Sequence, residues 1–219
     1  TMKHLFPLLF LFGFTPVFSQ GYFGLSGSAN LSIWEWHIRS LDTDIDYQPA
    51  VGWRFGALGG IKFAPWIGLR AELATQMKSN KIDDLEFSDM TSSGVYRERY
   101  QYWEGSLLVE VFPVKKLRSL YLMGGATTAY LGRARVKGCV TENGERKCLT
   151  SVVDLQEGFY RRNMASFDWG LGYEFTLDAA SRLRVEGRMQ QGLEDFTTHD
   201  NVDASVRSVM LGVAYVHRL

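Results

Sequence analysis

The fold is indicated most clearly by residues 167–175, which read Phe-Asp-Trp-Gly-Leu-Gly-Tyr-Glu-Phe. Large apolar residues occupy every odd position of this stretch, while Gly, Asp and Glu occupy every even position. A period of two places successive side chains on opposite faces of a β-strand. The stretch therefore predicts a strand with one apolar face and one small or charged face.

The same alternation recurs along the chain from Gln20 onward, although Leu108 and Met123 interrupt it by falling on the polar face of their runs. Most of the runs reach the roughly 9–11 residues that a tilted strand needs to cross a bilayer core. They lie at about 23–33, 51–63, 67–78, 95–112, 119–137, 164–177, 182–193 and 206–219. Together they predict an all-β fold with eight strands.

The connections between these runs alternate in length. The links after the second, fourth and sixth runs are short, whereas long polar segments occupy 35–50, 79–94, 138–163 and 194–205. An antiparallel up-and-down barrel with every long loop at one end produces this alternation. We therefore expect one eight-stranded antiparallel up-and-down β-barrel, without a second domain.

The polar face of the strands decides between two kinds of barrel. A soluble barrel of the lipocalin type turns its apolar face inward, whereas an outer-membrane barrel turns it toward lipid. The polar face here is rich in Gly and Ser, which suits a narrow interior, and its charges nearly cancel, as enclosed charges must. We therefore predict a transmembrane barrel with a charge network in its lumen, formed by Arg54, Lys62, Arg70, Lys78, Glu72, Glu104, Glu110, Asp168, Glu174, Arg182, Arg184, Glu186 and Arg188.

Bulky aromatic residues near the strand ends support the same orientation. Such residues form girdles at the two membrane interfaces of outer-membrane barrels. The candidates are Trp34, Trp53, Phe63, Trp66, Trp103, Trp169, Phe175 and Tyr215.

Composition limits the other possibilities. The chain has 219 residues, 24 basic and 24 acidic, with no basic block, which argues against a nucleic-acid-binding protein. Its 14% aromatic content argues against disorder. Beyond residue 19, no apolar run approaches the 18 to 20 residues or so of a membrane helix.

The first 19 residues have the layout of a secretory signal peptide. A positive start at Lys3 is followed by the apolar run 5–14 and by a small-x-small sequence that ends at Ser19. We expect cleavage before Gln20, which leaves residues 20–219 as an outer-membrane barrel domain with a net charge of −1 (23 basic and 24 acidic residues, after loss of Lys3).

Several stretches resemble the small outer-membrane β-barrels of Bacteroidetes, the PorT-like group, which have OmpA- or OmpX-like architecture. They are 102–112, 120–125, 167–175 and 191–195. The end of the chain resembles the insertion signal that the barrel-assembly machinery reads, with Gly212 and Tyr215 at the expected offsets and His217 where a Phe is usual. The resemblance implies an outer-membrane barrel with periplasmic termini and extracellular long loops. Some relatives serve protein secretion or barrel assembly.

Two cysteines are candidates for a disulfide or a metal site, and an acidic segment is a candidate for a calcium site. Cys139 and Cys148 flank an Asn-Gly turn, which in an exported protein favours a disulfide; a metal site would need two further ligands. The segment Asp42-Thr43-Asp44-Ile45-Asp46 suggests a calcium loop, but the positions that require Gly and Glu hold Tyr47 and Trp53. We therefore expect no metal and no cofactor.

An enzyme that modifies lipid A is the main alternative function, and it would need a His beside a Ser, oriented by a carboxylate. His37, His199 and His217 lack such partners in the sequence. A small passive channel ranks third, because an eight-stranded barrel is only wide enough to be filled by side chains. We therefore expect a non-enzymatic barrel that contacts outer-membrane lipid, lipopolysaccharide or an envelope machine for secretion or assembly.

Overall fold

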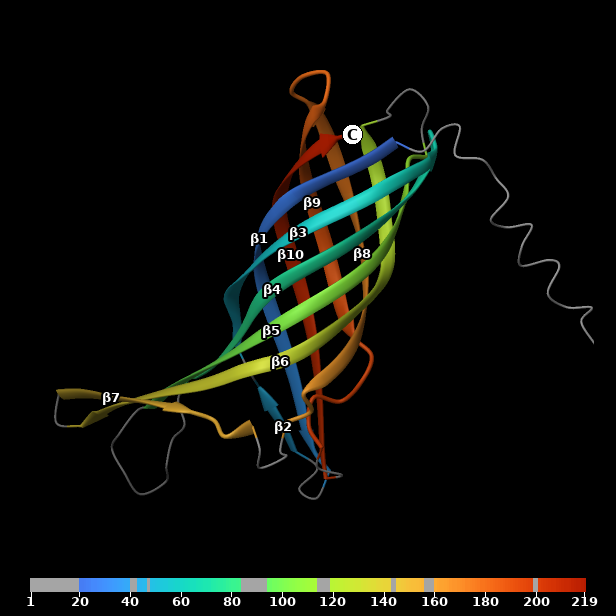
Figure 1. The fold of residues 1–219 in the computed structure, drawn as a ribbon. Helices are drawn as coiled ribbons and strands as arrows, with labels where there is room; N and C mark the ends of the chain where they lie inside the picture. The colour runs from blue at the N-terminus through green and yellow to red at the C-terminus, as the bar shows by residue number, and fades with distance from the viewer. Residues whose placement is uncertain are drawn as a thin grey trace, which may run out of the picture.

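The computed structural model describes residues 20–39, 43–46, 48–83, 94–113, 119–142, 145–155, 160–198 and 201–219. Eight long antiparallel strands lie side by side in a strongly tilted array (Figure 1). They are β1 (Gln20–Ile38), β3 (Gln48–Ala64), β4 (Ile67–Asp83), β5 (Gly94–Val111), β6 (Leu120–Glu142), β8 (Asn163–Thr176), β9 (Ser181–Gly192) and β10 (Val202–Arg218). Two short strands, β2 (Thr43–Asp46) and β7 (Glu145–Val152), pair with β1 and β6.

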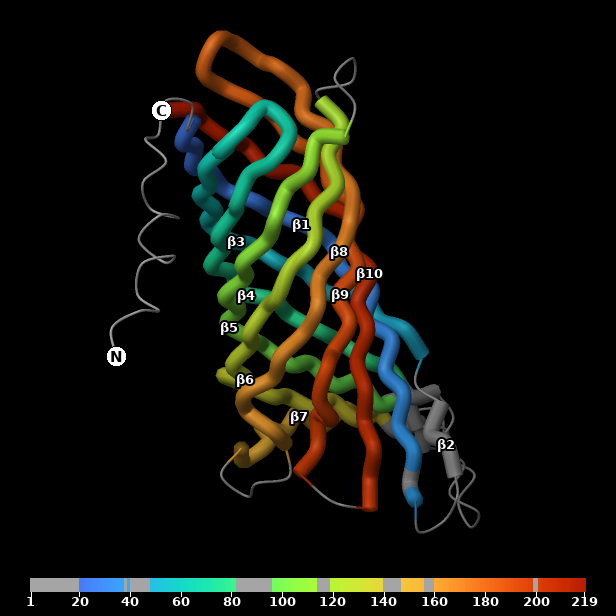
Figure 2. Tube along the Cα trace, turned by 90° about the vertical axis from the view of Figure 1, so that its right-hand side faces the viewer, coloured from blue at the N-terminus to red at the C-terminus, as the bar shows by residue number. Residues whose placement is uncertain are grey.

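The sheet closes on itself, because the last long strand pairs with the first. Each long strand pairs with the next along the chain, and β10 then pairs with β1 from Tyr22↔Arg218 to Ile38↔Val202 (Figure 2). A Cβ on Gly212 would lie 2.5 Å from the Cβ of Ser28, so this seam needs glycine at that position. The predicted all-β antiparallel up-and-down barrel is confirmed.

The two faces of the wall have opposite chemistry, as the alternation predicts. Outward-facing Leu73 is 74% exposed and Leu171 is 55% exposed, whereas inward-facing Arg70 and Asp168 are fully buried. Leu108 and Met123, which interrupt the alternation, are buried in the lumen beside Phe112. The barrel is therefore apolar outside and largely polar inside.

The strands run further than the sequence predicts. β6 continues to Glu142 and forms a hairpin with β7, inside the predicted loop 138–163, and this hairpin leads away from the barrel wall (Figure 1). The short strand β2 lies inside the predicted loop 35–50. The alternation did not predict these two strands, because both are short and rich in polar residues.

A β-bulge in β6 changes which of its residues face outward. The register between β5 and β6 shifts by one residue at Gly132, between the pairs Trp103↔Tyr130 and Gln101↔Arg133. Before the shift, the exposed residues of β6 are even-numbered, from Leu122 to Gly132; after it, the odd-numbered Arg133, Arg135 and Lys137 are exposed. This accounts for the less regular alternation of the 119–137 run.

The predicted aromatic girdles need one correction. Phe63, Trp66, Trp103, Trp169, Phe175 and Tyr215 are exposed on the outer face, and Trp53 is half-buried. Trp34, in contrast, is only 2% exposed and points into the lumen. Its position follows the inward parity of Asn30 and Ser32, which its size obscured in the sequence.

Both ends of the barrel carry specific polar contacts. In the turn between β8 and β9, Asp178 accepts hydrogen bonds from the backbone N–H groups of Ala180 and Ser181, at 2.8 and 2.7 Å, and these bonds lower the pKa of Asp178. At the opposite end, Arg39 forms a bidentate pair with Asp203, with distances of 2.7 and 2.6 Å, which lowers the pKa of Asp203. This pair joins the end of β1 to the start of β10.

Candidate functional site

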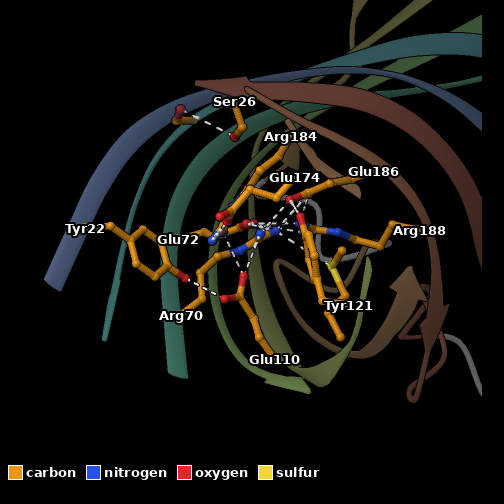
Figure 3. Close-up of polar contacts among 12 residues, drawn as sticks. Tyr22, Ser26, Arg70, Glu72, Glu110, Tyr121, Glu174, Arg184, Glu186 and Arg188 are labelled. Carbon is orange, nitrogen blue, oxygen red and sulfur yellow. Dashed lines mark hydrogen bonds and ion pairs between the residues drawn. The ribbon is translucent and has the colours of Figure 1, made fainter. Parts of the chain in front are cut away.

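The predicted lumen charges lie together in the middle of the barrel, in a layer that we call the ionic layer (Figure 3). It comprises Arg54, Arg70, Glu72, Glu104, Glu110, Asp168, Glu174, Arg184, Glu186 and Arg188. The residues come from β3, β4, β5, β8 and β9, and all lie on the inward parity of those strands. Burial this deep is tolerated only where charges are paired and hydrogen-bonded.

Arg70 lies at the centre of the ionic layer and is completely buried. Its guanidinium is 2.6 Å from Glu72, 3.1 Å from Glu110 and 2.6 Å from Glu186. Glu186 lies on β9, across the lumen from β4, and receives hydrogen bonds from both terminal nitrogens of Arg70. A planar guanidinium is suited to this kind of multiple carboxylate contact.

Glu72 is the corresponding acidic centre. Its oxygens lie 2.7 Å from Arg54, 2.6 Å from Arg70 and 2.9 Å from Arg188. Arg54 continues the network to Glu104 at 3.0 Å, and Arg188 continues it to Glu186 at 3.2 Å. The pairs therefore form one connected network and not a set of separate bridges.

Glu174 connects the network to the end of the barrel that carries the short turns. It lies 3.0 Å from Arg184 and 2.8 Å from Arg218, with Lys62 and Arg182 further away at 3.8 and 3.7 Å. Arg218 was not among the predicted lumen residues, although its inward parity at the end of β10 is visible in the sequence. Lys62 and Arg182, which the sequence also predicted as lumen charges, lie at the edge of the ionic layer and not within it.

Two tyrosines complete the ionic layer and were also missed. Tyr22 donates to Glu110 at 2.9 Å, and Tyr121 donates to Glu186 at 2.5 Å. Both rings lie beside the guanidinium of Arg184, with centroid distances of 4.5 and 5.2 Å. Each tyrosine is followed by an outward-facing apolar residue, so the alternation already predicts that both tyrosines face inward.

Asp168 of the ionic layer and the predicted lumen residue Lys78 have the weakest contacts. Neither carboxylate oxygen of Asp168 has a hydrogen-bond partner in the described part of the chain, and its nearest cation, Arg188, is 3.7 Å away. The ammonium of Lys78 lies 5.3 Å from the ring centre of Tyr102. A cavity of about 20 Å³ borders Arg54, Glu186 and Arg188, which is space for about one water molecule.

The lumen toward the long connections is filled differently. Its rings and aliphatic side chains form a cluster, which we call the aromatic cluster, of Trp34, Trp36, Tyr100, Tyr102, Ala129, Leu131, Ala134, Met164, Phe196, Ala204 and Val206. Phe196 lies at its centre, with ring centroids 4.9 Å from Trp34 and 5.0 Å from both Tyr100 and Tyr160. The sequence analysis did not predict this cluster.

The other predicted sites lie outside the ionic layer. Cys139 and Cys148 form a disulfide between directly opposed positions of β6 and β7, with Cα atoms 4.1 Å apart. His37 is half-buried in β1, and His217 lies beside Phe23 with a centroid distance of 5.6 Å. His199, Asp42 and Tyr47 lie outside the described residues.

The described residues lack two further features. They contain no group of His, Cys, Asp and Glu side chains that could hold a metal ion. No helix among them is long and apolar enough to cross a membrane.

Comparison with known proteins gives likenesses of fold. No protein-family model and no curated protein sequence matches the chain. Among solved structures, OprG from Pseudomonas aeruginosa is similar with 12% identity over 90% of this chain and 95% of its own, at a TM-score of 0.48. Ail of Yersinia pestis, in complex with the heparin analogue sucrose octasulfate, is similar with 12% identity over 90% and 99%, at 0.42. The outer-membrane protease OmpT from Escherichia coli is similar with 9% identity over 94% and 98%, at 0.40.

Proposed function

We propose that the chain is an integral outer-membrane barrel with a sealed lumen, and that it is a structural or interaction component without enzymatic activity. The carrying observation is the polarity of the wall, which is apolar outside and charged inside. A soluble barrel with Leu73, Leu171 and Leu211 exposed at 74%, 55% and 68% would leave a large apolar surface in water. In a bilayer the same surface contacts acyl chains.

The height of the apolar surface fits a bilayer. On β3, Trp53 and Phe63 are ten residues apart and both lie on the outer face. At about 3.3 Å per residue and a tilt of about 40°, they are separated by roughly 25 Å along the barrel axis, which is the usual height of the apolar band. Trp103 and Phe175 are further exposed aromatic residues of the two girdles.

The filled lumen supports a sealed barrel over a channel. Arg70 and Glu72 occupy the centre of the cross-section, and the aromatic cluster occupies the lumen toward the long connections. An ion crossing the barrel would have to separate these pairs and displace packed rings. We therefore propose that the purified protein gives no steady ion current in a planar bilayer, and a stable single-channel conductance would favour the channel alternative.

The hairpin of β6 and β7 is the proposed contact region for another envelope component. It projects beyond the wall, and Leu149 and Val152 on β7 are 77% and 57% exposed. The disulfide between Cys139 and Cys148 holds its two strands in register. With the sequence resemblance, this supports a PorT-like role in an envelope machine for secretion or outer-membrane assembly.

We also propose the remaining features of the exported protein. Residues 1–19 are a cleaved signal peptide, the barrel-assembly machinery inserts the domain 20–219 through the signal at Gly212, Tyr215 and His217, the termini are periplasmic, and the long connections are extracellular. Labelling of intact cells through single cysteines placed in the long connections, in a background without Cys139 and Cys148, tests the topology. Labelling confined to the short turns would reverse it.

Substitution of the wall tests the membrane orientation. Leu171→Arg places a charge in the apolar band, at a cost of roughly 2–4 kcal/mol near the bilayer centre. Gln190→Arg is the matched control, since Gln190 is 2% exposed in the lumen and is paired in the sheet with Asp168. The heat-dependent gel shift measures the fraction of the protein that is folded. We expect this fraction to be much lower for Leu171→Arg than for Gln190→Arg. Equal folding of the two variants in lipid vesicles would contradict the orientation.

The enzymatic alternative is tested separately. If the protein modifies lipid A, a strain that lacks it should show a lipid-A mass changed by one acyl chain or another substituent. We expect an unchanged lipid-A profile, and a shifted profile that the wild-type gene restores would replace the proposed function by the enzymatic one.

A further inference from the structure

A row of cations lies on the outer face of β5 and β6, beyond the girdle residues Trp103 and Tyr130. We call it the basic rim, and it consists of Arg97, Arg99, Arg133, Arg135 and Lys137, all of which are exposed. Arg97 is directly opposite Lys137, and Arg99 is directly opposite Arg135. The bulge at Gly132 is what brings the cations of β6 to the same face as those of β5.

Charges of one sign at directly opposed positions destabilise a strand pair. Within the described residues, no carboxylate forms an ion pair with any member of the basic rim; the described ion pairs of this end of the barrel lie elsewhere, at Arg39–Asp203, Arg161–Glu194 and Arg207–Glu35. This concentration of positive charge, which has no carboxylate partner among the described residues, points to an anion from outside the chain.

The basic rim borders a hollow of about 460 Å³. Its lining includes Arg97, Arg99, Arg135 and Lys137, with Cys139 and Thr150 of the β6–β7 hairpin beside them. The disulfide between Cys139 and Cys148 fixes the hairpin that forms this side of the hollow. The hollow has room for a phosphorylated sugar or glycerol headgroup, and guanidinium groups bind phosphate oxygens in bidentate fashion.

A second, apolar hollow lies on the membrane side of the basic rim. It has a volume of about 1020 Å³, and its outward lining includes Leu73, Trp103, Gly105 and Tyr130. Trp103 and Tyr130 form a pair in the sheet, two residues along β5 from Gln101 and four from Arg99. The same strands therefore present a cationic hollow next to an apolar one, which matches an amphiphile with an anionic head and acyl chains.

We propose that the basic rim binds the phosphate groups of a membrane lipid whose acyl chains lie in the apolar hollow. The inference rests on the proposed membrane location and adds a site to it. The phosphates have two possible sources, the phosphorylated glucosamines of lipid A and the headgroup of an anionic glycerophospholipid. The position of the rim, just beyond an aromatic girdle, is the level of the headgroups in either case.

The test uses the full barrel folded in detergent and titrated with defined lipids, with bound lipid counted by native mass spectrometry. The probes are bis-phosphorylated lipid A, the same lipid A without phosphates, and phosphatidylglycerol. We expect at least a tenfold preference for one or both phosphorylated lipids over dephosphorylated lipid A, and the tighter of the two identifies the source. Equal binding of phosphorylated and dephosphorylated lipid A, with no phosphatidylglycerol binding, would overturn the proposal.

Variants then locate the site. Arg99→Gln with Arg135→Gln should weaken binding of the preferred lipid about tenfold or more, and Arg97→Gln with Lys137→Gln should reproduce the loss. Arg161→Gln with Arg207→Gln is the matched control, because it removes two exposed cations that already have carboxylate partners. Loss of binding in the control to the same extent would overturn the assignment to the basic rim.

The heat-dependent gel shift and insertion into lipid vesicles are measured for each variant. A wild-type barrel that inserts but has no preference for phosphate refutes the lipid site and leaves the proposed function standing. A wild-type chain that does not insert into vesicles refutes both.

Discussion

The ionic layer and the aromatic cluster fill the same barrel in different ways. In the ionic layer, Arg70 on β4 contacts Glu186 on β9, so that the network connects opposite walls. In the aromatic cluster, Phe196 belongs to the segment between β9 and β10, and its ring packs on Trp34 and Tyr100. The first region therefore ties strands to each other across the barrel, and the second ties a connection to the inside of the wall.

This difference implies that the ionic layer stabilises the barrel as a whole, whereas the aromatic cluster stabilises the position of one connection. Separating the ionic layer requires the barrel to open, whereas removing Phe196 requires only that residues around it leave the lumen. The segment is held additionally by two backbone hydrogen bonds, from Phe196 N to Ala204 O and from Arg161 N to Phe196 O, both 2.8 Å. We expect the ionic layer to determine global unfolding and the aromatic cluster to determine local opening.

Arg70→Ala should have the largest effect. It leaves Glu72, Glu110 and Glu186 with less positive charge in a buried site, and removal of one partner from a buried pair costs about 3–5 kcal/mol. Urea unfolding of the barrel in lipid vesicles, followed by tryptophan fluorescence, measures the change. Lys62→Ala is the control, because its partner Glu174 keeps Arg184 and Arg218. If Lys62→Ala lost as much unfolding free energy as Arg70→Ala, the connected network would stabilise the barrel no more than a single peripheral ion pair does.

Phe196→Ala should have a smaller and more local effect. Truncation of a buried Phe costs about 3–5 kcal/mol in a rigid core, and the cost should be smaller here because Phe196 lies in a connection that can close part of the space left behind. We expect faster amide hydrogen exchange at Phe196 and Arg161, with little change in the urea midpoint of the barrel. Leu193→Ala, at a 63% exposed position of the same segment, is the control. A midpoint shift as large as that of Arg70→Ala would remove the distinction between the two regions.

Asp168→Asn should have the smallest effect, although Asp168 belongs to the ionic layer. Its oxygens accept no hydrogen bond from the described residues, and Arg188 keeps Glu72 and Glu186 as partners. Removing a buried charge that is poorly paired should leave stability unchanged or raise it by about 1 kcal/mol. The same urea experiment measures this, with Glu72→Gln as the contrasting variant. A large loss of unfolding free energy for Asp168→Asn would mean that proximity to Arg188 stabilises the barrel even without a hydrogen bond.

The sequence predicted the wall well because the rule behind it is local. Alternation along Phe167–Phe175 determines which side chains face outward, and the short links determine the antiparallel order. The same parity placed Arg70, Glu72 and Arg184 in one lumen. The pairing of Arg70 with Glu186, in contrast, depends on the tilt and register of the closed barrel, which no single strand encodes.

The parts that the sequence did not predict have physical reasons. Trp34 was assigned to a girdle because large aromatic residues near strand ends are common at interfaces, but its parity places it inside. The hairpin of β6 and β7 leads away from the barrel wall, beyond the proposed membrane band, where solvent does not require an apolar outer face and the alternation disappears. The basic rim was hidden because Arg133, Arg135 and Lys137 carry the inward parity of β6 until the register shifts.

Because of the extra residue at Gly132, two consecutive residues of β6, Gly132 and Arg133, both face outward. Every position of β6 beyond it exchanges inside for outside, so the cations that would otherwise crowd against Tyr100 and Tyr102 stand on the surface instead. If Gly132 instead paired with Gln101 in a regular register, Arg133, Arg135 and Lys137 would point into the barrel, and Ala134 and Val136 would lie on the outer face. The bulge, and not the order of residues alone, therefore decides which side chains of β6 reach the rim, while the wall below it keeps its side chains in place.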